Sequence, residues 1–145
     1  MANINVAITY NPSGATGNQW SLTATGTTVT GTTIEVNDRG ANPIQWSIGM
    51  AEGASGSINF STTSTAPGIQ FTGSNAWTGD PPTGNSNIWN SSLNNTLGEG
   101  APSQTFEYRV NAVYTPPGKG ANPSNVTWDP DVEENPPAQL VLKRR

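Results

Sequence analysis

A two-residue alternation of apolar and polar side chains is the feature that most limits the fold of this chain. Residues 4–10 alternate from Ile4 to Tyr10, and residues 106–114 alternate from Phe106 to Tyr114. No window of ten or more residues shows an apolar period of 3.6, and Gly or Pro interrupts every long segment. Period two is that of a half-buried strand, whereas amphipathic helices need period 3.6. We therefore expect an all-β chain.

Further short segments of the same kind follow one another along the chain, at 20–24, 29–36, 44–50, 58–60, 69–71, 126–128 and 140–142. Seven to nine short strands with Gly and Pro turns favour two packed sheets. A length of 145 residues suits one domain. We predict a single antiparallel β-sandwich over residues 1–145, either jelly-roll or immunoglobulin-like.

The chain contains neither cysteine nor histidine. Disulfides, thiolate or imidazole metal sites, cysteine nucleophiles and the Ser-His-Asp triad are therefore excluded. The sequence also lacks the G-x-S-x-G and S-x-x-K motifs of serine enzymes. We expect a protein that is not an enzyme, with no catalytic residues and no cofactor.

Charge is scarce: 11% of the residues are charged and the formal net charge is −4. A basic patch is the usual mark of nucleic-acid binding, and the only basic run, Lys143 to Arg145, is typical of a solvated end. No apolar run approaches the roughly 20 residues that span a bilayer, and residues 1–8 lack the pattern of a signal peptide. We expect synthesis in the cytoplasm with no nucleic-acid or membrane partner, a description that also fits a virion component or a released assembly.

Residues 73–103 form a stretch rich in Asn, Ser, Gly and Pro, with Asp80 and Glu99 as its only charges. We expect one long loop here, and loops of more than about 12–15 residues are usually functional or disordered. One alternative is a sugar-binding surface, because indole rings stack on sugars while amides and carboxylates bond hydroxyl groups. Its candidate residues are Trp77, Trp89, Asp80, Asn75 and Asn87. The other alternative is that both indoles plug an open end of the sandwich.

An acidic run near the end of the chain offers a second candidate site. Asp129, Asp131 and Glu133 share one face if the chain is extended, and their oxygens suit Ca²⁺. The spacing and central glycine of an EF-hand are absent, and Pro130 stiffens the segment. The favoured interpretation is a solvated acidic edge that discourages strand pairing, so we predict no metal site.

The pattern basic-Gly-Ala-Asn-Pro occurs at residues 39–43 and again at 119–123, each time before a segment that contains a tryptophan. Gly permits a positive φ, and the residue before Pro is restricted to extended geometry. We expect two hairpin loops that share one kind of turn.

The segment 106–114 and the later Val126-Thr-Trp-Asp-Pro-Asp-Val132 resemble the ending of bacterial inclusion-body proteins of the PixA/AidA type. Those proteins finish a β-sandwich with an aromatic-Asp-Pro strand, so the resemblance implies such a strand here. It covers less than a fifth of the chain, and we assign no family on it.

Residues 135–145, here called the C-terminal arm, begin with Asn135-Pro136-Pro137 and continue with Leu140, Val141 and Leu142. A Pro-Pro hinge before a strand favours exchange between protomers. The first hypothesis is a non-enzymatic structural protein that forms a homo-oligomer or packs in a larger particle. The alternative is a lectin-like module that binds a neutral glycan through Trp77 and Trp89.

Overall fold

The computed structural model describes residues 3–15 and 17–137, and its regular elements there are all strands. The all-β expectation is confirmed. In chain order the strands are β1 (Ile4–Tyr10), β2 (Trp20–Thr25), β3 (Val29–Thr30), β4 (Thr33–Val36), β5 (Gly40–Met50), β6 (Ser57–Phe60), β7 (Thr62–Thr63), β8 (Ala66–Pro67), β9 (Ile69–Phe71), β10 (Asp80–Gly84), β11 (Ile88–Asn95), β12 (Gln104–Thr115), β13 (Ser124–Trp128) and β14 (Asp131–Glu134).

The number of strands is 14, so the expectation of seven to nine was wrong. Turns divide segments that the sequence pattern joins: Gly31, with a φ of 63°, separates β3 from β4. Residues 57–71 form four short strands, β6 to β9, where two were expected. Such turns break the backbone ladder without interrupting the alternation of side chains.

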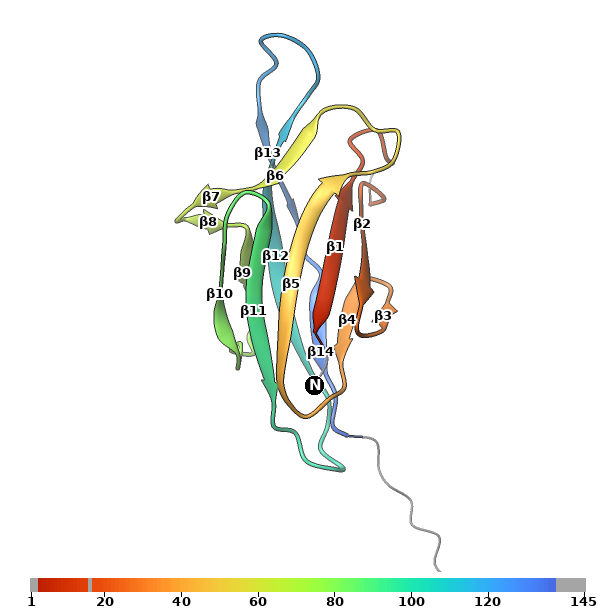
Figure 1. Cartoon of the computed structure of the whole chain (residues 1–145), viewed down its shortest axis with the longest axis vertical. Coiled ribbons are helices and arrows are strands. Elements are labelled where there is room, and N and C mark those ends of the chain that lie inside the picture. The colour runs from red at the N-terminus through yellow and green to blue at the C-terminus, as the bar shows by residue number, and fades with distance from the viewer. Residues whose placement is uncertain (1–2, 16, 138–145) are drawn as a thin grey trace, which may run out of the picture.

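Two main sheets make up the fold (Figure 1). The first has the order β10-β11-β5-β1-β2. The second is built around β12, which pairs with β6 and β9 along one edge and with β13 and β14 along the other; β4 and β3 follow β14. Strands β7 and β8 form a separate small hairpin.

Both main sheets are mixed, which corrects the expectation of purely antiparallel pairing. β1 pairs with β5 in parallel, and β14 pairs with β4 in parallel. The chain causes this itself: after β2 it passes through β3 and β4 in the second sheet, and then returns as β5 on the other side of β1. A connection through the opposite sheet allows neighbouring strands to run in the same direction.

One buried cluster takes side chains from both sheets. Trp46 on β5 and Tyr108 on β12 are fully buried at its centre, and Trp46 Nε1 donates a hydrogen bond of 3.2 Å to the Tyr108 hydroxyl. Burial raises the pKa of that hydroxyl far above its ordinary value. The predicted alternation is confirmed on β1, where every second side chain from Ile4 to Tyr10 is buried.

The stretch 73–103 contains β10 and β11, so the expectation of one long loop was wrong. Trp89 and Leu93 on β11 are buried, at the spacing of four that one face of a strand allows. Asn and Ser occupy the positions between and beside them, which hides the alternation in the sequence. β11 pairs with β5 over its whole length, and this central partner compensates for its weak strand composition.

The repeated basic-Gly-Ala-Asn-Pro pattern gives two different structures after its glycine. Gly40 and Gly120 both have positive φ, at 87° and 73°. Asn42 is nevertheless already part of β5 and buried, whereas Asn122 lies in the exposed connection before β13. The two occurrences share a glycine with positive φ, and the expectation that they share one kind of turn was otherwise wrong.

We predict that Gly68→Ala destabilises the fold by about 1–3 kcal/mol, because it overpacks the core. A Cβ at Gly68 would lie 2.5 Å from Trp89 Nε1 and 2.8 Å from Phe60 Cβ. Gly98→Ala is the matched control, since nothing lies within 4 Å of a Cβ there. Urea unfolding of the three proteins measures the difference, and equal midpoints for the two variants would show that Gly68 is not a packing position.

Candidate functional site

Trp89 lies in the core, with 7% of its surface exposed. It stands opposite Trp46 across the β11–β5 pair and contacts Phe60 edge to face, with ring centroids 6.4 Å apart. Its Nε1 has no hydrogen-bond partner within the described part of the chain. An indole in this position packs the two sheets together and presents no ring face for stacking on a sugar.

Trp77 sits at the outer end of the same aromatic cluster and remains half-buried. Its ring stacks on Phe71 at 4.0 Å and meets Phe106 edge to face at 5.2 Å. Its Nε1 donates to the Asp80 carbonyl at 2.9 Å and to Ser91 Oγ at 3.0 Å. These contacts fix the indole in place, with Phe71 covering one of its faces.

The remaining sugar-site candidates are not gathered around Trp77. The Asp80 carboxylate accepts a hydrogen bond of 2.9 Å from Ser92, beside Trp77. The amide of Asn75 donates to the Thr105 carbonyl at 2.8 Å. Asn87 lies in the turn after β10, at the opposite end of that strand from Asp80. Only Trp77 and Asp80 are therefore brought together.

A groove of about 390 Å³ opens between β9 and β10, on the side of the molecule where each sheet ends. We call it the β9–β10 groove. Its lining is mainly aromatic, aliphatic and proline side chains: Pro67, Ile69, Gln70, Phe71, Trp77, Gly79, Pro81 and Pro82. Its volume falls within the range of about 300–1,000 Å³ that is common for ligand sites.

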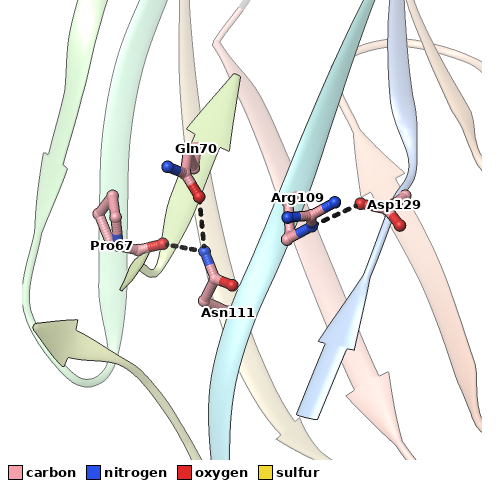
Figure 2. Close-up of polar contacts among 5 residues, drawn as sticks. All are labelled: Pro67, Gln70, Arg109, Asn111 and Asp129. Carbon is pink, nitrogen blue, oxygen red and sulfur yellow. Dashed lines mark hydrogen bonds and ion pairs between the residues drawn. The ribbon is translucent and has the colours of Figure 1, made fainter. Parts of the chain in front are cut away.

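Asn111 anchors the β9 side of this groove from the outer face of the second sheet (Figure 2). Its amide donates to the Pro67 carbonyl at 2.7 Å and to Gln70 Oε1 at 3.2 Å. Its own N–H donates to the Gly68 carbonyl at 2.9 Å. Although Asn111 points to the outer face, it is buried because the segment from Pro67 to Gln70 covers it.

The three acids of the C-terminal run have different surroundings. Asp129 forms an ion pair with Arg109 at 3.0 Å, and both side chains are well exposed (Figure 2). Asp131 accepts a hydrogen bond from the Thr33 hydroxyl. Asp131 and Glu133 share the outer face of β14, as their spacing predicted. Among residues 3–15 and 17–137, no three acidic side chains are gathered closely enough to hold a metal ion.

Glu134 follows on the inner face of β14 and is almost completely buried, at 2% exposure. Its Oε2 has no hydrogen-bond partner among the described residues, and burial raises the pKa of its carboxyl above the ordinary value. The next residue, Asn135, is held by several bonds: its N–H donates to the Val36 carbonyl at 2.9 Å, and its carbonyl accepts from Asn95 at 2.8 Å. The root of the C-terminal arm is thus fixed to the body.

Residues Leu140, Val141 and Leu142, the candidate assembly segment, lie outside the described residues. The end of the described chain is Pro137, two residues after the anchored Asn135. The cationic run from Lys143 to Arg145 also lies outside.

The opposite side of the molecule, formed by β2 and β13, escaped the sequence analysis as a candidate surface. Trp20 on β2 and Trp128 on β13 stack across it with ring centroids 5.6 Å apart and planes 4° apart. Neither β2 nor β13 contains a charged residue or a proline. The lack of charge along these two strands was the only feature of the sequence that could have indicated this surface.

Comparisons with protein-family models and with curated proteins find no match to this chain. In the described part of the chain, no helix is long and apolar enough to cross a lipid bilayer.

We predict that Glu134→Gln raises the free energy of unfolding, by an amount that grows as the pH rises above the ordinary Glu pKa of about 4.3. The folded state holds the Glu134 proton more tightly than the unfolded state does, because burial raises the pKa. Wild-type stability therefore falls as the pH rises through this window. Chemical unfolding between pH 4 and 8 measures the difference.

Glu133→Gln is the matched control, since Glu133 is the neighbouring acid on the outer face. The free energy of unfolding of Glu133→Gln should differ from that of the wild type by an amount that changes less with pH than the corresponding difference for Glu134→Gln. If both variants follow the same pH profile, the buried environment of Glu134 is not what couples its ionisation to folding.

Proposed function

We propose that this chain is a non-enzymatic structural protein that assembles with copies of itself through its sheet edges. We also infer that its two sheets form a β-sandwich, because their inner faces share one buried cluster. The observation that carries the functional proposal is β2, an edge strand of six residues without charge or proline. Unprotected edge strands are templates for pairing with another chain.

The backbone of β2 has one row of hydrogen-bonding groups to offer. Asn11 N–H donates to the Gln19 carbonyl at 2.7 Å, which sets the phase of the β1–β2 ladder. Because hydrogen-bonded pairs alternate, Ser21, Thr23 and Thr25 bond to β1. The N–H and C=O groups of Leu22 and Ala24 point away from β1, and among the described strands β2 pairs only with β1.

Two other edge strands, β10 and β3, carry the protection that β2 lacks. β10 contains Pro81 and Pro82, and its register to β11 shifts between Asp80 and Thr83. β3, the outer strand of the second sheet, has only two residues. Prolines, bulges and short length are common means of blocking edge pairing. The contrast supports β2 as the preferred contact, with β13 beside it through the Trp20–Trp128 stack.

The glycan-binding alternative has less support. It needs exposed indole faces with polar groups around them, and of its two tryptophans Trp89 is buried while Trp77 stacks on Phe71. The β9–β10 groove is lined mostly by apolar side chains, and Gln70 is its only amide. A neutral sugar would find few side-chain hydrogen-bond partners there.

We predict that Ala24→Pro weakens self-association at least tenfold while leaving the monomer folded. The substitution removes an N–H that points to the free edge and leaves the β1 ladder intact, and proline is tolerated on edge strands in such positions. Light scattering over a concentration series measures the association, and circular dichroism checks the fold.

Thr23→Pro is the matched control, because the Thr23 N–H belongs to the β1 ladder. This variant should lose stability as well as association. If Ala24→Pro associates as strongly as the wild type, pairing at the β2 edge is excluded.

A further inference from the structure

We propose that the β9–β10 groove receives residues Leu140–Leu142 of a second copy, with Lys143–Arg145 placed against the carboxylates near the groove. This inference rests on the proposed self-association and names a contact on the side of the molecule opposite to β2. The occupant would be an extended apolar segment followed by three cations.

The walls of the groove suit such an occupant. The floor of the groove is continuous with the buried core. The ring centroids of Trp46 and Phe71 lie 6.4 Å apart, and those of the stacked Phe71 and Trp77 lie 4.0 Å apart. Pro81 and Pro82 form the wall on the β10 side. A partly exposed aromatic and proline surface of this kind gains free energy when apolar side chains cover it, and leucines in an extended chain place their side chains on one face at every second residue.

One wall also offers backbone hydrogen bonds. Thr72 N–H donates to the Glu107 carbonyl, and Asn111 N–H donates to the Gly68 carbonyl. The alternation of the β9–β12 ladder then directs the N–H and C=O groups of Ile69 and Phe71 away from β12. β9 pairs only with β12 among the described strands, so an added strand can bond to these groups, as in strand addition at other sheet edges.

Charge favours the same occupant. Three of the six cations of the chain lie in residues 143–145, so the rest has three cations against ten acids, a net charge of −7. Asp80 begins β10 beside Trp77, and Gly73, two residues after Phe71, donates its N–H to the Glu107 carbonyl at 3.3 Å. Cations that follow Leu142 would meet these two carboxylates if the segment runs parallel to β9.

In its own molecule the segment cannot lie parallel to β9 with Leu140 beside Ile69. Asn135 follows Glu134, which pairs with Gln104, so it sits about seven residues along β12 from Val110, the partner of Ile69. Seven residues span about 23 Å and two strand spacings about 10 Å, which places Ile69 about 25 Å from Asn135. Leu140 is five residues from Asn135 and reaches at most about 18 Å when fully extended. A second copy therefore supplies the segment.

Cysteine cross-linking tests the contact cleanly, because the chain has no cysteine of its own. One tagged protein carries Pro81→Cys in the groove wall, and a differently tagged protein carries Leu142→Cys. After mixing and mild oxidation, we expect the mixed disulfide to form at least tenfold faster than with Val141→Cys, because an extended segment with Leu142 in the groove would direct residue 141 away from it. Thr83→Cys, exposed on the same strand but not part of the groove lining, is the control for Pro81→Cys.

Equal rates for Leu142→Cys and Val141→Cys, or for Pro81→Cys and Thr83→Cys, would overturn the groove contact. If light scattering still shows association in that case, the proposed function stands and only this contact is wrong. If the unaltered chain stays monomeric and no mixed disulfide forms, both proposals fail.

Discussion

The hydrogen bond between Trp46 and Tyr108 joins the centres of the two sheets, and the other layers of the structure are arranged around it. Both side chains are fully buried, and their rings lie 5.7 Å apart. Each belongs to the longest strand of its sheet, β5 with 11 residues and β12 with 12. A buried polar pair is costly unless it is satisfied, so this contact favours one alignment of the sheets over others. From Tyr108 the aromatic packing continues outward through Phe71 to Trp77 at the groove.

This arrangement leaves two different open sides. On one side, β2 and β13 present uncharged edges, and Trp20 stacks on Trp128 across them. On the other, β9 and β10 leave an apolar groove between them, with prolines protecting β10.

An ordinary soluble domain has about 25% charged residues, whereas 11% are charged here. Neither β2 nor β13 contains any of these charged residues, whereas three acids lie in β14. Two dissimilar open sides are what the proposed larger assembly would require.

Local alternation allowed the strands to be predicted wherever apolar residues are dense, as in β1 and β12. It could not reveal β10 and β11, because Asn and Ser fill the positions between Trp89 and Leu93 and the strand is stabilised by its pairing with β5. Parallel pairing also escaped prediction, since it depends on which sheet the chain enters after β2. Of the candidate site, the sequence showed Trp77 and Asp80 but not the walls that face them. Phe71 precedes Pro81 and Pro82 by about ten residues in the sequence, and the three become one groove only when the two sheets pack.

Self-association through surfaces that carry little charge is tested most directly by sedimentation velocity of the unaltered protein over a hundredfold range of concentration. If the chain assembles in the proposed way, its weight-average sedimentation coefficient rises with concentration, and it does so in high salt as well, because backbone and apolar contacts at the β2 edge are weakly screened. A single species of 15.2 kDa at every concentration would contradict it.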